Sequence, residues 1–469
     1  MSFGVDVLPT NTRLPGVNLG YNTRNALQGI QVSEKNALFV VQKTSEGNAE
    51  NLKRYPIGSE SAAIQLFGRG STGHIAIRNA LAQNRNGTYF AVAIENSGVA
   101  AQGAIDISGT ATEGGRLRLT IGQESVSVVI RSGDAASVVR QNLLTALSSE
   151  NLALQVNPTA GGTGIVLAAK CAGASGNTIG ISTSTENGGG ISFTISQMGN
   201  GTDDIKVDGL FSLLAKSKNN IISFPYDYDT TQGSGDFANL ESYLKKVTDP
   251  IEQGSTIAVI GYIGDCSTNI PAKPNNPRIA FVNMRNAYFS LDAMVAQLTA
   301  DILANPDPAI PLNNNILTML SPDSMGTDYL RGEQEILLRN GITPLQITAS
   351  GRVSIVRLVS TETVGVSEKV PDMWIRTLDY VREAIRAEVD AAIHKKKDTE
   401  RNVQMVRGVI LGVLLKLDEA EILKNVRDWS DRLIVVRNPD NIGTFLAQIP
   451  ADAVIGLHGV IGTIDLIVS

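Results

Sequence analysis

The sequence predicts a multi-domain protein of mixed α/β and β structure, and three observations support this prediction. The chain has 469 residues, too many for one ordinary core and enough for several domains of about 150 residues each. Through residues 202–352, strand-like segments alternate with helical ones, as in a largely parallel sheet with covering helices. Between residues 99 and 201 the composition turns to Gly, Ser, Thr and Val with alternating apolar positions, which is typical of β structure.

These changes of pattern divide the chain into five predicted segments. They are an extended arm and linker (1–34), a small α/β unit (35–98), an inserted β domain (99–201), an α/β domain (202–352) and a C-terminal domain that ends in a strand-like tail (353–469).

The small α/β unit begins with a predicted strand at 37–43 and ends with another at 88–95. Between them, the stretch "GSESAAIQLFG" predicts a short helix, because Ser59 or Ser61 can cap its start and Gly68 can end it. A second helical pattern follows in "STGHIAIRNALAQN".

The glycines of "LFGRGSTGHIAI" have the G-x-G-x-x-G spacing of a dinucleotide-binding loop, with Glu95 at about the distance of a ribose-binding acid. That motif requires a strand before the first glycine, whereas here a helix is predicted. Glycines at a joint between two helices can serve only to supply positive φ. We therefore expect Gly68, Gly70 and Gly73 to have a structural role.

In the inserted domain, the stretch 116–131 places apolar residues at alternate positions on both sides of Gly122-Gln123, which predicts a β-hairpin. A helix over 135–149 follows, with Asp134 as its predicted cap. Further strands are predicted at 152–156, 164–170, 178–183 and 191–197.

The α/β domain is predicted to contain three strands and three helices. The strands are expected at 219–226, 256–263 and 278–284, and the helices at 236–253, 290–305 and 331–341. Asp236 is the expected cap of the first helix, and Gly341 ends the third.

The C-terminal domain is predicted from a strand at 354–359, an amphipathic helix at 372–396, a second helical region that ends near residue 426 and a strand at 432–438. The alternating segment 454–469 ends the chain as a predicted strand.

Composition excludes several classes of partner. The net charge of −6 and an aromatic content of 5% argue against nucleic acid, which requires clustered cations and bases stacked on aromatic rings. The longest apolar run, 408–415, has eight residues and is too short to span a bilayer, which needs about 20.

No export signal is recognised at the start, so the chain is expected to fold in a cytoplasm. Cys171 and Cys266 are expected to be buried, reduced thiols.

The sequence predicts no catalytic, metal or cofactor site. The three histidines are His74, His394 and His458, and none falls in the α/β stretch 205–350 that most resembles an enzyme core. Asp227, Asp229 and Asp236 lack the distal ligands of a calcium loop and are expected in a solvated loop. The stretch "GASGN" has Asn177 where a nucleophile elbow needs glycine.

The two ends of the chain suggest assembly. An extended arm and a terminal strand expose backbone groups that can pair with a neighbouring sheet. Five or six such pairs supply several kcal/mol, at roughly 0.5–1.5 kcal/mol for each hydrogen bond. Repeated head to tail, such contacts produce rings or helical polymers. The alternative, that both ends pack on their own body, stays open on these residues alone.

Several stretches in order resemble the tail sheath proteins of contractile-tailed bacteriophages, especially the Mu-like kind. They are "RLPGVNLGYN", "LFGRGSTGHIAIRNALAQN" with "TYFAVAIE", the insertion from "AIDISGTATEGGRLRLTIGQ" to "ASGNTIGI", "LLRNGITPLQITASGRVSIVRLVST" and the closing "RLIVVRN" to "TIDLIV". The likeness covers nearly the whole chain. One departure is Asn18, which stands where the family often has an aromatic residue after PGV.

This resemblance implies a subtilisin-like α/β domain without catalysis, an inserted β-sandwich and an α+β C-terminal domain that receives terminal arms from neighbouring subunits. It implies a structural protein of the virion, assembled in the host cytoplasm, with no cofactor. Hexameric rings would stack around a tail tube and contract to drive it through the host envelope. The implied partners are further copies, the tube protein, and baseplate and tail terminator proteins, with no nucleic acid and no membrane.

The exchanged segments are expected near both ends of the chain. The residues predicted for the N-terminal arm are Val5, Val7, Leu8, Leu14 and Val17, and those predicted for the C-terminal strand are Ile461, Ile464, Leu466 and Val468. A contact with acidic tube or sheath surface is predicted for Lys395, Lys396, Lys397 and Arg401, although such a charge run can also be simply solvated. The alternative function is a nucleotide-dependent oxidoreductase or a serine hydrolase.

Overall fold

A computed structural model describes residues 34–202, 205–226, 239–285, 287–320, 328–363 and 373–458. Contacts divide the chain into two units. The α/β unit holds Lys35–Arg376 together with residues 455–458, and the C-terminal unit holds Thr377–Val454. Among the described residues, no helix is both long and apolar enough to cross a membrane.

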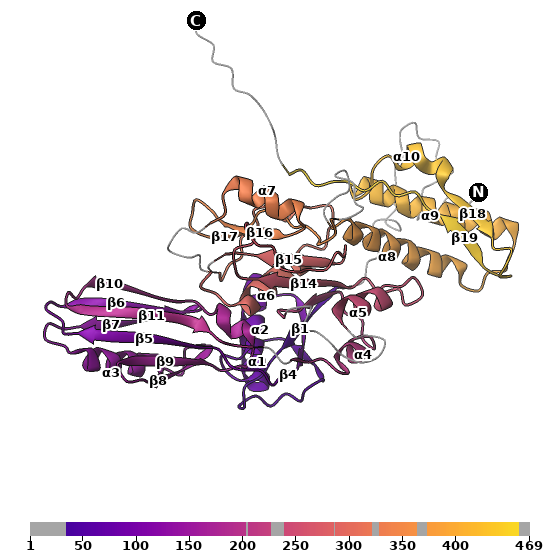
Figure 1. Cartoon of the computed structure of the whole chain (residues 1–469). Coiled ribbons are helices and arrows are strands. Elements are labelled where there is room, and N and C mark those ends of the chain that lie inside the picture. The colour runs from indigo at the N-terminus through magenta and orange to yellow at the C-terminus, as the bar shows by residue number, and fades with distance from the viewer. Residues whose placement is uncertain are drawn as a thin grey trace, which may run out of the picture. The chain divides into compact units, whose positions relative to one another are not determined.

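The α/β unit is built on one eight-stranded sheet (Figure 1). Its strand order is β17-β16-β15-β14-β13-β1-β3-β2. The strands from β16 to β3 pair in parallel, whereas β17 and β2 pair antiparallel at the two edges. Their bounds are β1 (Asn36–Val41), β2 (Arg54–Ile57), β3 (Thr88–Ala93), β13 (Ile221–Ser223), β14 (Ile257–Tyr262), β15 (Ile279–Asn283), β16 (Thr343–Ile347) and β17 (Val353–Ile355).

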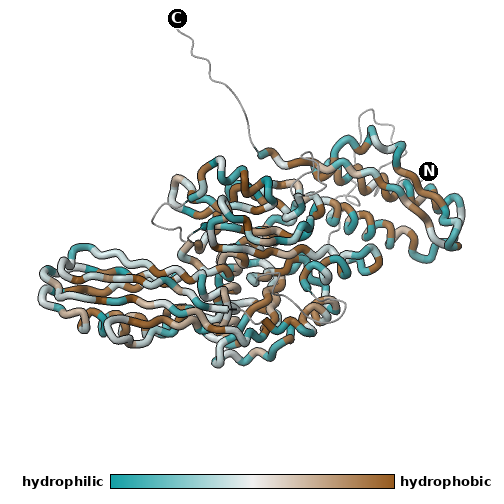
Figure 2. The backbone as a smooth tube through the Cα atoms, in the orientation of Figure 1, coloured by the Kyte–Doolittle hydropathy of each residue, from teal (hydrophilic) through white to brown (hydrophobic). Residues whose placement is uncertain are grey.

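Each face of this sheet has its own hydrophobic core. Successive residues of β1 point to opposite faces, so Phe39 enters one core and Leu38 the other. Helices α1 (Glu60–Phe67), α2 (Thr72–Gln83) and α6 (Leu291–Ala304) supply the first core. The helices α4 (Leu210–Leu214), α5 (Leu240–Val247) and α7 (Arg331–Arg339) supply the second. Figure 2 shows the central strands as continuously hydrophobic, which agrees with burial on both faces.

The inserted segment contains two antiparallel sheets around a third core. One sheet has the order β10-β6-β7 and the other β11-β5-β9-β8. The strands are β5 (Gln102–Gly109), β6 (Gly115–Ile121), β7 (Glu124–Ile130), β8 (Val156–Ala160), β9 (Gly164–Ala169), β10 (Ile181–Asn187) and β11 (Ile191–Gly199). Helix α3 (Ala136–Leu147) packs Val139, Leu143 and Leu147 into this core. A short pair, β4 (Glu95–Asn96) with β12 (Ile205–Lys206), joins the two ends of the insertion.

The C-terminal unit contains helices α8 (Trp374–Ile393, of which the first three residues belong to the α/β unit), α9 (Glu400–Glu419) and α10 (Val426–Trp429). A two-stranded antiparallel sheet of β18 (Ile434–Arg437) and β19 (Phe445–Gln448) completes it. Apolar residues of all these elements except β19 are fully buried in a fourth core, against which Phe445 of β19 packs.

Most predicted elements are confirmed, including the hairpin around Gly122-Gln123 and the helix that Gly341 ends, but three local predictions were wrong. Asp134 does not cap α3, because its carboxylate accepts a hydrogen bond from the Arg131 amide and thereby closes the preceding turn. The helix predicted at 236–253 is shorter, and Asn239 caps it by accepting from the Ser242 amide. Of the strand predicted at 152–156, only Val156 lies in β8, which continues to Ala160.

The finer fold names, a subtilisin-like domain and a β-sandwich, and the five segment boundaries stay predictions.

Candidate functional site

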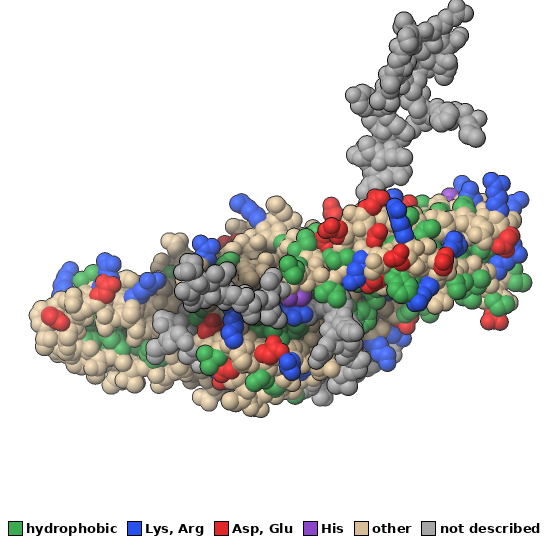
Figure 3. Space-filling model, turned by 90° about the horizontal axis from the view of Figure 1, so that it is seen from above, with side chains coloured by type: hydrophobic (Ala, Val, Ile, Leu, Met, Phe, Trp, Pro, Cys, Tyr) green, Lys and Arg blue, Asp and Glu red, His purple; other side chains and the backbone are tan. Residues whose placement is uncertain are grey.

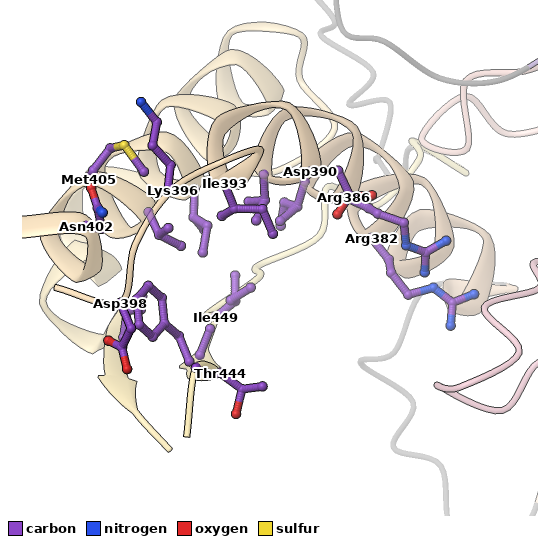
Figure 4. A pocket seen from close by; sticks show the side chains of 18 of the residues that line it. Arg382, Arg386, Asp390, Ile393, Lys396, Asp398, Asn402, Met405, Thr444 and Ile449 are labelled. Atoms are coloured by element: carbon purple, nitrogen blue, oxygen red, sulfur yellow. The ribbon is translucent and has the colours of Figure 1, made fainter. Parts of the chain in front are cut away.

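The C-terminal unit contains a groove of about 720 Å³ between its helices and its two-stranded sheet (Figure 4). Figure 4 shows Ile393 and Met405 from the helical side and Ile449 and Thr444 from the sheet side around the same space, with Arg382 and Arg386 further along α8. All residues that line the groove lie between Leu378 and Ala451.

Helix α8 forms one wall through an apolar stripe. Leu378, Val381, Ile385, Val389 and Ile393 recur every three or four residues and therefore share one face of the helix. Within this stripe only Val381 is fully buried, while Leu378 and Ile393 are 37% and 44% exposed. The stripe therefore lacks the cover that an amphipathic helix normally finds in its own domain.

The sheet and α9 form the opposite wall. Val435 of β18 and Phe445, Ala447 and Ile449 of the β19 strand and its extension follow the period of two that puts side chains on one face. From α9, Met405, Val406 and Ile410 complete the apolar lining.

The sheet beside the groove has two strands, and within the described residues β18 and β19 pair only with each other. Each of these strands therefore has one edge without a strand partner in that part of the chain. Backbone N–H and C=O groups at such an edge can receive an added strand.

The rim of the groove has a positive balance of charge. Four basic side chains line it, Arg382, Arg386, Lys396 and Lys397, against Asp390 and Asp398. The Arg382 guanidinium donates to Asp379 at 2.9 Å, and Asp398 pairs with Arg437 at 3.0 Å. An apolar floor with this rim suits an extended apolar segment that carries few charges.

The lining of the groove has no histidine or cysteine. Across the described ranges, no cluster of three or more His, Cys, Asp or Glu side chains is placed to hold a metal ion.

Of the glycines with dinucleotide-type spacing, Gly68 and Gly70 lie at the joint between two helices, as predicted, and Gly73 lies in the first turn of α2. Ser59 caps α1 by accepting from the Ala62 amide, and Gly68 ends this helix at φ +84°. Gly70 has φ +77°, and α2 begins at Thr72, after Ser71 as its cap. No strand delivers Gly68, so the phosphate cradle that the motif requires is not formed.

His74 of α2 is fully buried and has two partners. Its Nδ1 accepts from the Gly70 amide at 3.0 Å, and its Nε2 lies 3.0 Å from a carboxylate oxygen of Glu60. Burial lowers the pKa of His74, although the Glu60 carboxylate opposes this effect. The imidazole joins α1 to α2, which is a structural role.

Both cysteines are free thiols, as predicted. Cys266 is fully buried, as predicted, whereas Cys171 is only partly buried. Desolvation raises the pKa of each thiol to about 12, so neither is a thiolate at neutral pH.

The residues predicted from sequence for exchanged segments fall outside the described part of the chain: Val5, Val7, Leu8, Leu14, Val17, Ile461, Ile464, Leu466 and Val468. Asp227, Asp229 and Asp236 do so as well. Of the predicted basic contact, Lys395, Lys396 and Lys397 are exposed between α8 and α9, and Arg401 is exposed in the first turn of α9. Lys396 and Lys397 line the groove. Figure 3 shows acidic side chains interspersed among the basic ones on the visible face.

The groove was not predicted from the sequence. The signal was present in two places, namely the apolar stripe of α8 and the alternation of Phe445, Ala447 and Ile449. Neither pattern reveals by itself that the two faces lie opposite each other with space between them.

No family model matches the chain. A Mu-like prophage FluMu tail sheath protein of Haemophilus influenzae is 23% identical over an alignment of 469 residues that covers 94% of each chain. The predicted resemblance to Mu-like tail sheath proteins is thereby confirmed. The relative is named as a tail sheath protein, and tail sheath proteins are structural proteins, which agrees with the expectation that this chain is not an enzyme.

Two solved structures are similar in fold. The sheath tail protein of Desulfitobacterium hafniense has a TM-score of 0.50 at 12% identity, covering 94% of this chain and 97% of that one. The sheath tail protein of Listeria innocua has a TM-score of 0.49 at 15% identity, covering 91% and 93%.

Proposed function

We propose that this chain, which resembles Mu-like tail sheath proteins along most of its length, is the structural subunit of a contractile phage tail sheath. Subunits polymerise as stacked hexameric rings around a tail tube, and the lattice shortens to drive the tube through the host envelope. The protein is a component of the virion, assembled in the host cytoplasm, and its further partners are the baseplate and tail terminator proteins.

The groove of the C-terminal unit is the observation that carries this proposal. It combines an apolar floor, a positive rim and a sheet with free edges. Together these features fit an extended strand from another copy, because the strand's backbone pairs with the sheet edge while alternate side chains enter the groove.

The ends of the chain have the matching chemistry. Residues 459–469 read GVIGTIDLIVS, which contains one charged side chain, Asp465. Ile464, Leu466 and Val468 alternate and would face the groove together, leaving Asp465 on the opposite face. The N-terminal arm supplies Val5, Val7, Leu8, Leu14 and Val17 as a second apolar segment.

Strand exchange of this kind connects copies by backbone hydrogen bonds, so the bodies can rotate while the lattice stays joined. Contraction then requires two packings of one lattice, the extended one being metastable. Lys395, Lys396, Lys397 and Arg401 are proposed to meet acidic tube or sheath surface.

The alternative of a nucleotide-dependent oxidoreductase or serine hydrolase has little support. The glycine motif lacks its strand, and the nearby His74 is buried between two helices.

Negative-stain microscopy of the purified chain tests the proposal. We expect tubes or short stacks of rings at high protein concentration. A chain that stays monomeric at every concentration and salt condition would contradict it.

A further inference from the structure

The residues just before the C-terminal tail lie against the α/β unit, not against the unit that contains the groove. The chain leaves the C-terminal unit at Val454, and residues 455–458 belong by their contacts to the α/β unit. Their exposure alternates, as in an extended strand on a surface. Ile455 and Leu457 are 43% and 79% exposed, while Gly456 and His458 are partly buried.

Contacts with Pro311 and Asn313 hold this short segment. Gly456 packs on the ring of Pro311, and a Cβ added at Gly456 would lie 2.9–3.0 Å from three ring carbons, so only glycine fits without a shift. The side-chain amide Nδ2 of Asn313 lies 2.8 Å from Nδ1 of His458, a distance at which the amide donates to a neutral imidazole.

The receiving segment is itself fixed. Leu312, between Pro311 and Asn313, is 2% exposed in the core that α2 and α6 share. The Asn314 amide donates to the Ile355 carbonyl of β17, and the Asn315 side chain donates to the buried Asp301 of α6. Gly456 and His458 thus rest on a surface tied to the central sheet and to α6.

We propose that Pro311, Asn313, Gly456 and His458 form a tail anchor, which fixes the start of the C-terminal tail on the α/β unit and directs the tail to the groove of another copy. This inference rests on the proposed function and identifies residues that position the exchanged strand. Residues 459–469 follow the anchor in the sequence, and eleven residues reach at most about 40 Å when fully extended.

The anchor acts by limiting the conformations of the tail before exchange. A short segment with a fixed start loses less entropy on pairing than a longer free one, and its local concentration near the target is higher. Release of the anchor would lengthen the free segment and redistribute it, which weakens exchange between copies.

Substitutions at both contacts test the anchor. Gly456→Val places branched carbons against Pro311, and Asn313→Ala removes the hydrogen bond to His458. Leu457→Ser changes the most exposed residue of the same segment and is the matched control. Sedimentation at a series of protein concentrations gives the critical concentration for polymerisation, and the melting temperature of the soluble chain reports folding.

We expect Gly456→Val and Asn313→Ala each to raise the critical concentration by roughly twofold, with little change in melting temperature, while Leu457→Ser behaves as wild type. If Gly456→Val lowers the melting temperature, Gly456→Ala and Asn313→Ala decide the question. Unchanged critical concentrations in these anchor variants would overturn the proposal.

A chain that ends at residue 460 separates the two claims. If this truncated chain no longer polymerises while the anchor variants polymerise normally, tail exchange stands and the anchor is wrong. If the truncated chain polymerises as the full chain does, tail exchange fails and the anchor fails with it.

Discussion

At the scale of single residues, His74 shows how burial sets the charge of a side chain. The imidazole is fully buried, and its Nδ1 is occupied by the Gly70 amide. Desolvation therefore lowers its pKa in the folded chain, with Glu60 opposing this effect. In the unfolded chain the pKa returns to about 6.5.

This difference predicts a loss of stability in acid. A histidine with a depressed folded pKa contributes stability that is present above about pH 6.5 and is lost as the pH falls through the folded pKa. We expect His74→Asn to reduce the loss of stability that occurs as the pH falls below about 6.5.

Thermal unfolding at several pH values measures this effect, with the exposed His394→Asn as control. Equal acid sensitivity in wild type and His74→Asn would show that other groups govern this range.

Residue patterns predicted where the backbone takes a positive φ better than they predicted which groups a side chain hydrogen-bonds. Gly68 and Gly341 end helices with positive φ, as the sequence indicates, because only glycine takes this conformation readily. Asp134 fails as a predicted cap because an Asp near a helix start can instead close a turn, and the sequence does not distinguish the two uses.

At the scale of elements, the start of α1 allows a direct comparison of two serines. Ser59 accepts a hydrogen bond from the Ala62 amide, whereas Ser61 lies inside the helix and is exposed. We expect Ser59→Ala to lower the free energy of unfolding by about 1 kcal/mol, since an orphan amide loses its partner.

Ser61→Ala is the control and is expected to be neutral or slightly stabilising, because alanine favours the helix interior. Chemical denaturation measures both variants. Equal effects at the two positions would show that the Ser59 cap adds nothing.

Strand β19 allows a matched test of the groove. Ala447 faces the groove, whereas its neighbour Gln448 does not line it and points to the other face of the same strand. We expect Ala447→Lys to reduce polymerisation strongly, because it places a charge where an apolar strand must bind. Gln448→Lys should leave polymerisation nearly unchanged.

Light scattering during assembly measures both variants, and circular dichroism checks folding. If both lysines reduce assembly equally, the groove face has no special role in it.

Sequence patterns predicted helices and strands well where the periodic hydrophobic pattern extended over many residues. The 20-residue helix α8 and the hairpin of β6 and β7 were expected, whereas β2 and β19 have only four residues each and gave no clear signal. The strand predicted at 152–156 was wrong because the alternation of apolar residues reports burial and not strand pairing. Leu154 and Val156 are both buried, but only Val156 belongs to a strand.

At the scale of the whole molecule, the resemblance supplied what periodicity did not. Composition and alternation indicated parallel and inserted β structure, but they left it open whether the chain ends fold back or pair with another copy. The groove between α8 and the two-stranded sheet is the site at which the proposed strand would bind.

Removal of the N-terminal arm tests the second exchanged segment. We expect deletion of residues 1–20 to abolish polymerisation, because this arm supplies one of the added strands, and to leave the circular dichroism spectrum nearly intact. Loss of the folded spectrum would instead show that the arm belongs to the subunit's own core.

Cross-linking between two different variants tests the central claim, that the tail of one copy occupies the groove of another. One chain carries Ala447→Cys and the other carries Leu466→Cys, and Cys171→Ser is present in both. A disulfide can join the two new cysteines because adjacent paired strands bring Cα atoms to about 4.5–5.5 Å, within disulfide range. Ile464→Cys and Val468→Cys sample neighbouring registers.

After oxidation, non-reducing electrophoresis should show covalent dimers of the two variants when the chains are mixed, and no such heterodimer when either chain is incubated alone. A chain that carries both cysteines and closes within one copy, together with no dimers in any mixture, would contradict the account.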